Sequence, residues 1–469
     1  MRERLLTRFI RSFSDFQFLS FVSFTKIQGK PPCKKVIFLY MTQKISDKFS
    51  IGKFLNFSLL LILTAAVLTS LSLSCQKNPF NLGDDDDDRE VINLDSLARA
   101  NDFIPISTFH ELCRIGKDKD LPLDTNYMLI KNINVSKNDW RLFDPIGTRI
   151  NPFTGVFDGY GHTVKKVHIR RVDSTDVGFF GFTEGAVIKR LHIEADSILG
   201  GTNVVAAETN VGGIVGMARN TIIDSCSFSG RVIGKQWVGG IVGTAFGTGI
   251  TRSISEGIVR SDGVGGAAGG LVGSLTDGSI VSLSFSKTDV VGTGFHNTGG
   301  LVGDNYISEI DRSYSIGSVS GGIGFTGGLL GHVHDGHIWH SYSTGKVNWK
   351  EPGEAGGLIG RVSRNSTVTG SYWDTLTSRI SISMGTVLVD TAIIVGGELR
   401  DTTLIVNGEP VDTTIIVGGE LRDTTIVLRG EVGLDTQRMM QKRTYAGWDF
   451  NTIWNIEEGK STPYFMWHE

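Results

Sequence analysis

The sequence predicts an all-β protein whose body is a right-handed parallel β-helix, or solenoid, of about seven repeat units with N- and C-terminal caps. Three observations predict this fold: a glycine motif recurs at nearly constant spacing, two further positions recur at fixed offsets from it, and glycine is abundant. The 469 residues include 60 glycines against only 10 prolines, whereas ordinary glycine usage is about 7%. Glycines spread among Ile, Val, Leu and Ser indicate tight turns between short strands.

The recurring motif is Gly-Gly-(Ile/Leu)-(Val/Leu/Ile)-Gly, and successive copies begin 27 to 30 residues apart. A degenerate copy, Val177–Gly181, precedes them. The six full copies are residues 212–216, 239–243, 269–273, 299–303, 327–331 and 356–360. A motif at this period is typical of a protein that grows by stacking identical structural units.

Two further positions keep fixed offsets from the motif. An apolar residue follows ten positions after the second glycine, as Ile188, Ile223, Ile250, Ile280, Ile310 and Ile338, with Val368 one residue late. A glycine follows seven positions later, as Gly230, Gly257, Gly317 and Gly345, with Lys287 breaking the series. Short β-branched runs bounded by glycine predict two or three strands per unit, and stacking at about 4.8 Å per turn closes a continuous core. Parallel crossovers favour the right-handed form.

The motif resembles the core of GLUG repeats, over residues 173–374. The flanks fit this resemblance, because Phe157–Val164 resembles the entry turn of β-helix proteins and the aromatic residues of 448–467 resemble a closing segment. GLUG repeats occur in bacterial surface proteins, adhesin-like proteins and some IgA-cleaving peptidases. The resemblance therefore implies a surface β-solenoid without fixing one activity.

The N-terminal part has the pattern of a secretory signal. Residues 57–73 are an apolar run preceded by lysines and followed by Cys75, as in a signal peptide. We interpret residues 1–40 as an upstream mis-start and 41–74 as a lipoprotein signal peptide, because the cut before Cys75 resembles a bacterial lipobox. Cys75 is the predicted lipidation site; the alternative is a retained membrane anchor.

An acidic tether is predicted over residues 75–102, since five consecutive aspartates, Asp84 to Asp88, cannot pack. This run also resembles a signal that sends some Gram-negative lipoproteins to the outer face of the outer membrane; a simple spacer is the alternative. We expect a lipid-anchored, surface-exposed protein. Residues after 74 carry a net charge of −11, which argues against nucleic acid as a partner and leaves only the lipid anchor for membrane contact.

The rest of the chain divides around the repeats. Residues 103–172 are expected to form an N-terminal cap and the first strands, with a capping box at Thr108–Glu111. Residues 375–437 hold an 11-residue tandem whose copies begin at Asp390, Asp401, Asp412 and Asp423. This tandem predicts an inserted four-strand meander, and deletion of 386–433 is expected to leave the fold intact. Residues 438–469 should cover the C-terminal end of the array.

Sequence motifs for metal or cofactor chemistry are weak. His110-Glu111 begins a zinc-peptidase pattern, but Arg114 stands where the second histidine is needed. His332, His334, Asp335, His337 and His340 could form a metal site, although a histidine-rich polar turn is the favoured interpretation. Cys113 and Cys226 are expected to be buried and unbridged. We predict no metal, no cofactor and no catalytic residues.

The sequence comes nearest to a binding site at an aromatic column. Tyr314, Tyr342 and Tyr372 occupy equivalent places in three successive units. Exposed tyrosines would suit the apolar faces of sugar rings, whereas buried ones would form an internal stack. The predicted function is an adhesin or a scaffold that binds a glycan or a host or cell-surface protein. The alternatives are a polysaccharide-degrading lyase or glycosidase and a structural subunit of a surface assembly.

Overall fold

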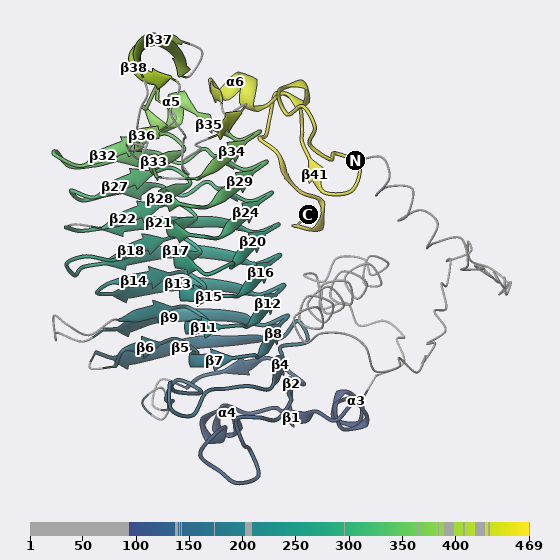
Figure 1. Ribbon diagram of the computed structural model, residues 1–469. Coiled ribbons are helices and arrows are strands. Elements are labelled where there is room, and N and C mark those ends of the chain that lie inside the picture. The colour runs from purple at the N-terminus through teal and green to yellow at the C-terminus, as the bar shows by residue number, and fades with distance from the viewer. Residues whose placement is uncertain are drawn as a thin grey trace, which may run out of the picture. The chain divides into compact units, whose positions relative to one another are not determined.

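The structure is a computed structural model that describes residues 93–468 apart from 137–138, 140, 142, 173, 202–208, 295, 364, 383, 389–397, 407–408, 418–426 and 430–431. Within these residues the chain winds into a parallel β-solenoid whose turns stack one on another (Figure 1). The predicted β-helix is therefore confirmed. Each repeat turn crosses four sheets, rather than the two or three strands expected per unit, and the sheets are here called walls D, C, A and B in the order in which the chain visits them.

Walls D and C meet at the repeat motif. Wall D contains β6 (Asp176–Val177), β10 (Asn210–Gly212), β14 (Trp237–Gly239), β18 (Ala267–Gly269), β22 (Asn297–Gly299), β27 (Phe325–Gly327) and β32 (Glu354–Gly356). Wall C contains β7 (Phe180–Glu184), β11 (Val215–Arg219), β15 (Val242–Phe246), β19 (Val272–Thr276), β23 (Val302–Tyr306), β28 (Leu330–His334), β33 (Ile359–Ser363) and β36 (Met384–Leu388). The seven motif copies start seven successive turns, and β36 adds a further strand to wall C.

Walls A and B complete each turn. Wall A contains β1 (Ile104–Ile106), β2 (Tyr127–Leu129), β4 (Val156–Asp158), β8 (Val187–Lys189), β12 (Ile222–Asp224), β16 (Gly249–Thr251), β20 (Ile280–Ser282), β24 (Glu309–Asp311), β29 (His337–Trp339), β34 (Thr367–Thr369) and β39 (Val427–Arg429). Wall B contains β3 (Ile133–Asn134), β5 (Thr163–Arg171), β9 (His192–Gly200), β13 (Ser227–Gly234), β17 (Ile254–Ser261), β21 (Phe285–Gly292), β25 (Tyr314–Ser315), β26 (Val319–Ser320), β30 (Tyr342–Ser343), β31 (Val347–Asn348), β35 (Tyr372–Asp374) and β40 (Val432–Leu434).

The paired glycines of the motif are required by backbone packing. A Cβ atom on Gly239 would lie 2.0 Å from the carbonyl oxygen of Val242 in the same bend. A Cβ atom on Gly240 would lie 2.2 Å from the carbonyl oxygen of Gly270 in the next turn. Both neighbours are backbone atoms that set the bend and the stacking distance, so they cannot move aside for a side chain.

The apolar residues of the motif fill the interior. Its third position is fully buried in every full copy, as Ile214, Ile241, Leu271, Leu301, Leu329 and Leu358. Wall A contributes a second inward column, which consists of Ile188, Ile223, Ile250, Val281, Ile310, Ile338 and Val368. Because one such column lies above another in successive turns, the core is continuous along the solenoid.

The inward column corrects one expected position. Ile280 occupies the recurring apolar position in the sequence, but Val281 is the residue that points inward, and Ile280 is 37% exposed. The bend before β20 contains Asp277 and Gly278, both with positive φ, and it is one residue longer than the bend before β16. The same extra residue explains the break in the glycine series, because Thr288, rather than Lys287, pairs with Gly257.

The N-terminal turns are covered by a short helix and its flanking strands. Helix α3 (Leu94–Ala100) precedes β1, and helix α4 (Phe109–Arg114) begins at the capping box of Thr108 and Glu111. Buried aromatic rings, with Phe157 packed against Phe179 and Phe180, close the interior behind them. Among the described residues, helices fall short of the length and apolarity that a membrane span requires.

The tandem region differs from the expected four-strand meander. Strands β37 (Glu398–Val406) and β38 (Glu409–Val417) form an antiparallel hairpin. The following strands instead extend the solenoid in parallel, with β39 on wall A and β40 on wall B. Together with β36 these strands complete a last turn, so part of the predicted insertion belongs to the solenoid itself.

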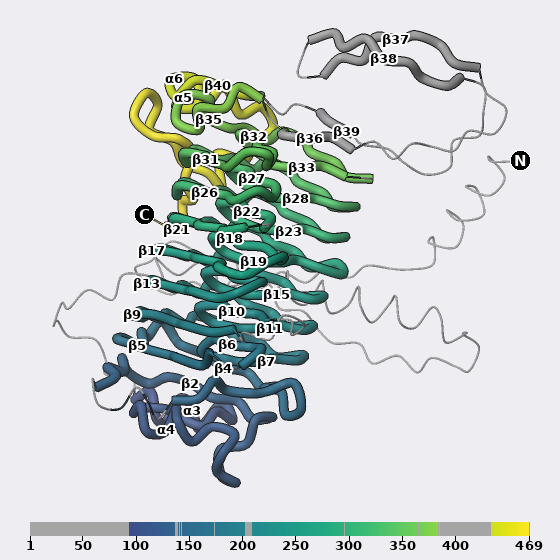
Figure 2. The backbone as a smooth tube through the Cα atoms, turned by 90° about the vertical axis from the view of Figure 1, so that its left-hand side faces the viewer, coloured from purple at the N-terminus to yellow at the C-terminus, as the bar shows by residue number. Residues whose placement is uncertain are grey.

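The C-terminal segment, residues 435–468, lies along the outside of wall B rather than over the end of the array (Figure 2). Its elements are α6 (Thr436–Met439), η2 (Lys442–Thr444), the β-hairpin of β41 (Trp454–Asn455) and β42 (Tyr464–Phe465), and η3 (Met466–His468). Helix α5 (Thr375–Ser378) precedes this segment and contacts α6. The expected C-terminal cap is therefore a cover on one side of the last turns.

Candidate functional site

The three tyrosines of the predicted binding column stack on the outer side of wall B. Tyr314 pairs with Tyr342, and Tyr342 pairs with Tyr372, on adjacent strands. The ring centroids of Tyr314 and Tyr342 are 4.8 Å apart, with ring planes 6° from parallel. Phe285 continues the stack on the turn before, 4.6 Å from Tyr314. The repeat therefore aligns these rings as the sequence suggested.

The aromatic residues of the C-terminal segment cover this stack. Trp454 packs against both Tyr314 and Tyr342. The hydroxyl group of Tyr342 donates a hydrogen bond to the carbonyl oxygen of Pro463. The exposed fractions of Tyr314, Tyr342 and Tyr372 are 4%, 0% and 7%. Burial raises the pKa of all three phenols above its ordinary value.

The expected exposed glycan-binding column is therefore wrong in this structure. The tyrosines are packed, as the alternative interpretation held, but the stack lies outside the solenoid core in a separate apolar cluster. The tyrosines are buried because the tryptophans of the segment that follows the repeats pack on the apolar surface of the column. Cys75, the predicted lipidation site, lies outside the described residues.

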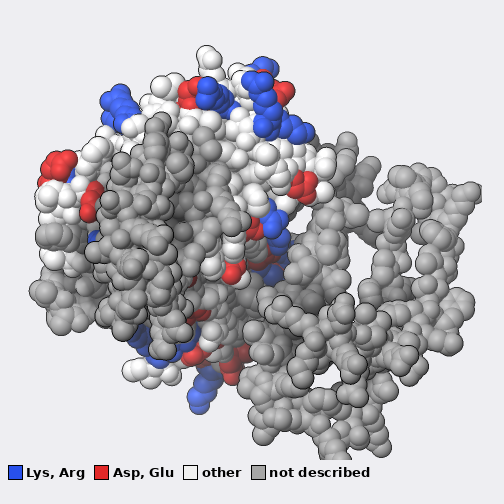
Figure 3. All heavy atoms as spheres, turned by 45° about the horizontal axis from the view of Figure 1, so that its top comes forward, with Lys and Arg blue, Asp and Glu red and all other residues white. Residues whose placement is uncertain are grey.

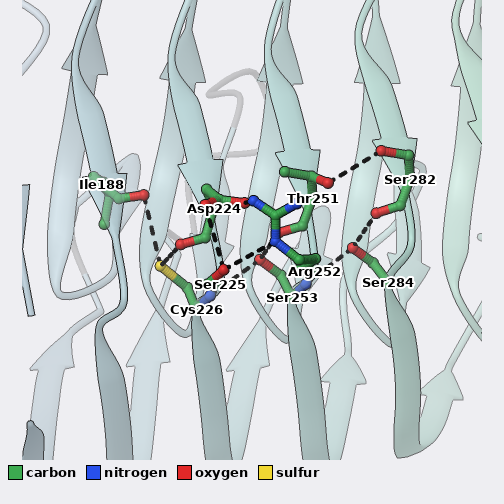
Figure 4. Close-up of polar contacts among 9 residues, drawn as sticks. All are labelled: Ile188, Asp224, Ser225, Cys226, Thr251, Arg252, Ser253, Ser282 and Ser284. Atoms are coloured by element: carbon green, nitrogen blue, oxygen red, sulfur yellow. Dashed lines mark hydrogen bonds and ion pairs between the residues drawn. The ribbon is translucent and has the colours of Figure 1, made fainter. Parts of the chain in front are cut away.

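The corner between walls A and B carries a regular set of basic side chains. The residue after each wall A strand from β8 to β34 has a left-handed backbone, with φ of 45° to 56°, in Arg190, Ser225, Arg252, Leu283, Arg312, His340 and Gly370. Arg252 lies 2.5 Å from Asp224 on the turn before and donates to the hydroxyl group of Ser225 at 3.2 Å (Figure 4). Arg190 clamps the buried Asp158 in the same way. These arginines are therefore engaged in ion pairs between turns.

The inner side of the same corner holds a ladder of hydroxyl groups, which Figure 4 shows beside the ion pair. Ser253 and Ser284 each accept a hydrogen bond from the backbone N–H one turn earlier, and each donates to a carbonyl two residues before it. Cys226 takes the first place in this ladder, where it is fully buried and unbridged. Burial raises the pKa of the Cys226 thiol. Cys113 is only partly buried, contrary to expectation.

The histidine-rich stretch is divided between two walls and does not converge on one point. His334 stacks on Tyr306, 4.8 Å away, on wall C. His337 contacts the hydroxyl group of Thr367 through Nδ1 at 2.6 Å on wall A. His340 lies at the arginine corner, 3.8 Å from Asp311. Among the described residues no group of three His, Cys, Asp or Glu side chains could hold a metal ion.

His332 has two polar partners on wall C. Its Nδ1 lies 2.9 Å from Asp304 on the turn before, and its Nε2 lies 3.0 Å from the hydroxyl group of Ser363 on the turn after. The sequence analysis noted His332 but missed Asp304 and Ser363. Asp304, His332 and Arg361 each follow the last glycine of a motif copy, so comparing equivalent positions of successive repeats could have brought Asp304 next to His332.

An open hollow of about 290 Å³ lies on the last turns, lined by Val347, Asn348, Trp349, Glu351 and Arg379. Trp349 is 41% exposed. Strand β31 supplies the first two residues, and Arg379 ends helix α5. The hollow thus combines an aromatic face with a cation, a carboxylate and an amide. The sequence pattern singles out neither residue as a site, since Arg379 lies beyond the repeats, where no periodicity could align it with Trp349.

Charge is not segregated on the face that Figure 3 shows. Lys and Arg side chains lie interspersed with Asp and Glu among uncharged residues there. This view offers no broad field of one sign that would attract a highly charged polymer. A ligand of that face would have to be recognised by local contacts.

Comparisons with known proteins show distant similarities in sequence and in structure. No protein-family model matches the chain. Halomucin from Haloquadratum walsbyi is 29% identical over 161 residues, which are 34% of this chain and 2% of halomucin, so the chain spans a small fraction of that relative. The crystal structure of a "putative immunoglobulin A1 protease" from Bacteroides ovatus has a TM-score of 0.44 and 15% identity, over 78% of this chain and 93% of that one.

Proposed function

We propose that the protein is a surface-exposed, lipid-anchored adhesin-like scaffold whose solenoid presents a glycan-binding site at the hollow beside Trp349. The GLUG resemblance of the repeat supports a surface solenoid. The proposal depends on the set of side chains in the hollow. The apolar face of the half-exposed Trp349 is in contact with water, and a sugar ring could stack on that face and cover it.

The chemistry of the hollow favours a glycan over an apolar ligand. Arg379, Glu351 and Asn348 supply donors and acceptors around the ring of Trp349. Hydroxyl groups on a sugar can use both kinds, while the C–H face of the sugar covers the indole. The hollow also lies far from the N-terminal turns of the solenoid, since seven steps of about 4.8 Å separate β4 from the last turns, about 35 Å in all.

A glycan array tests this site directly. We expect the wild-type protein to bind at least one glycan class and Trp349→Ala to lose about tenfold or more in affinity, in line with about 1–3 kcal/mol for a lost stacking contact on an aromatic ring. Trp339→Ala is the matched control, because Trp339 is a partly exposed tryptophan on wall A. Equal losses in both variants would contradict the site. Release of reducing ends during the assay would instead favour a polysaccharide-degrading enzyme.

The anchor is tested independently of the binding site. Metabolic labelling with an alkyne fatty acid should mark the wild-type protein and leave Cys75→Ala unmarked, because the thiol at the signal-peptide cut carries the lipid. Cys113→Ala is the control for loss of a cysteine as such. Labelling of Cys75→Ala at the wild-type level would contradict lipidation at this position.

A further inference from the structure

Wall C carries an ordered hydrogen-bonded chain of three side chains. Asp304, His332 and Ser363 come from β23, β28 and β33, which are three successive turns of the solenoid. His332 lies between the other two, 2.9 Å from the Asp304 carboxylate through Nδ1 and 3.0 Å from the Ser363 hydroxyl group through Nε2. The rigid stacking of parallel strands fixes this geometry.

The carboxylate determines where the proton of the neutral imidazole lies. An ionised Asp304 can only accept hydrogen bonds, so Nδ1 of His332 must carry the proton. Nε2 then presents its lone pair to the hydroxyl group of Ser363, whose proton points toward it. This is the order of partners, and the tautomer, that nucleophilic serine catalysis requires.

Arg361 lies next to this chain on the same strand as Ser363. It is the strand partner of His332, and its guanidinium group stacks 4.4 Å above the ring of Phe325. Its Nε is buried and has no hydrogen-bond partner among the described residues. Its positive charge, two residues from the Ser363 hydroxyl group on the same strand, is suited to stabilise the negative charge that develops during acyl transfer.

A second histidine on the neighbouring wall lacks this arrangement. His337 contacts the hydroxyl group of Thr367 at 2.6 Å, also across adjacent turns. Within the described residues no carboxylate lies within ion-pair distance of His337, and the contact uses Nδ1. The pair of His337 and Thr367 therefore shows what a purely structural histidine–hydroxyl contact looks like in this solenoid and provides a matched control.

We propose that Ser363 is the nucleophile of an esterase site in which His332 is the general base and Asp304 is its positioning residue. As the Ser363 oxygen bonds to the ester carbonyl carbon, its proton moves to Nε2 of His332. The carbon–oxygen bond to the alcohol then breaks, and the alcohol leaves with that proton. Water attacks the acyl-serine in the same manner and releases the carboxylic acid. This activity does not depend on glycan binding at Trp349.

A fluorophosphonate probe tests the nucleophile in the full-length protein. We expect mass spectrometry to locate the adduct on Ser363, and we expect no adduct in Ser363→Ala. Asp304→Asn and His332→Gln should slow labelling at least about 100-fold, because both disturb the base. Thr367→Ala should label at the wild-type rate. Exclusive labelling of another serine, or wild-type labelling of both Asp304→Asn and His332→Gln, would overturn the proposal.

Hydrolysis of p-nitrophenyl acetate separates catalysis from folding. The wild type should release p-nitrophenol with an initial burst as the acyl-serine accumulates, and Ser363→Ala should release it no faster than buffer. Thermal melting of each variant is measured alongside. A merely structural chain would lower the melting temperature of the variants while the wild type shows neither burst nor adduct, and that result would also overturn the proposal.

Discussion

Wall B has opposite polarity in its lower and upper halves. In the lower turns the inward residues are apolar and the outward ones polar, as Val164, Ile193 and Phe228 against Thr163, His192 and Ser227. In the upper turns, at the same two strand positions, the inward residues are serines and the outward ones apolar or aromatic, as Ser255, Ser286, Ser315 and Ser343 against Ile254, Phe285, Tyr314 and Tyr342. In the last of these turns Trp373 points inward and Tyr372 outward. At these positions the strands pair in continuous register, and the register shifts in the lower turns lie further along the strands.

The glycine pair of the repeat allows both halves to pack. In the lower half, the ring of Phe228 lies so close to Gly213 that a Cβ atom there would be 2.4 Å from it. In the upper half, Ser255 and Ser315 donate hydrogen bonds of 2.6 Å to the carbonyl oxygens of Gly270 and Gly328. The interior therefore accommodates both an aromatic ring that packs on the bend and a serine that donates a hydrogen bond to a carbonyl oxygen of the bend.

The reversal also determines where the C-terminal segment lies. The contacts of this segment run from Tyr372 down the column to Phe285, where Trp467 and His468 pack at its end. Below Ile254 the outward column becomes polar. The outward apolar column of the upper turns is therefore covered by the C-terminal segment over its whole length, because an exposed apolar surface of that size favours a packing partner.

Removing the central ring of the cover should have the largest effect. Trp454 is fully buried and contacts both halves of the tyrosine stack. Trp454→Ala should lower the free energy of unfolding by about 3–5 kcal/mol, as for other large buried aromatics. Urea denaturation measures it, with the partly exposed Trp339→Ala as the control. A loss below about 1 kcal/mol would show that the segment only rests on wall B.

Lowering the pH should destabilise the lower turns of wall B. Burial, with a smaller effect of His162, lowers the pKa of His192 to about 4. Because the unfolded chain binds this proton near pH 6.5 and the folded chain does not, the unfolding free energy falls as the pH drops from about 6.5 to 4, by up to about 3 kcal/mol. His192→Gln should flatten this dependence in urea titrations at a series of pH values. An unchanged slope would contradict the assignment.

A single hydroxyl group tests the upper half more finely. Tyr342→Phe removes the hydrogen bond to Pro463 and leaves that carbonyl without its donor, which should cost about 1–2 kcal/mol. Tyr372→Phe is the control, because among the described residues its hydroxyl group has no hydrogen bond. Calorimetry compares the two. Equal melting temperatures would mean that ring packing alone holds the cover.

The smallest effect is expected in the tandem region. Replacing residues 389–426 with a short glycine–serine linker should change the unfolding free energy by no more than about 0.5 kcal/mol, since β36, β39 and β40 remain. The deletion of 386–433 suggested by the sequence removes β39 and most of β40, which complete the last turn. We now expect that larger deletion to expose the end of the solenoid and to detach the cover, with a large loss of stability.

The sequence alone determined the solenoid. Each glycine pair fits the same tight bend, and the Ile or Leu after each pair is buried. The spacing of the pairs along the sequence therefore predicts the stacked turns. It also predicted that Tyr314, Tyr342 and Tyr372 align, because equivalent positions of adjacent turns are neighbours. It placed Ile280 one position wrong, because an additional residue in a bend leaves the period almost unchanged.

Only the tertiary structure decided which way the tyrosines face and what lies beside them. Arg312, with its left-handed backbone, turns the corner just before Tyr314, so that Ile310 points into the core while Tyr314 points outward. The cover comes from residues about 60 to 150 positions later in the chain than the tyrosines, beyond any local pattern. Asp304, His332 and Ser363 are likewise brought together by the stacking of turns, since 59 residues separate the first from the last. The local sequence determines the conformation of each turn. Which side chains on different turns lie next to one another depends on the register of all the strands between them.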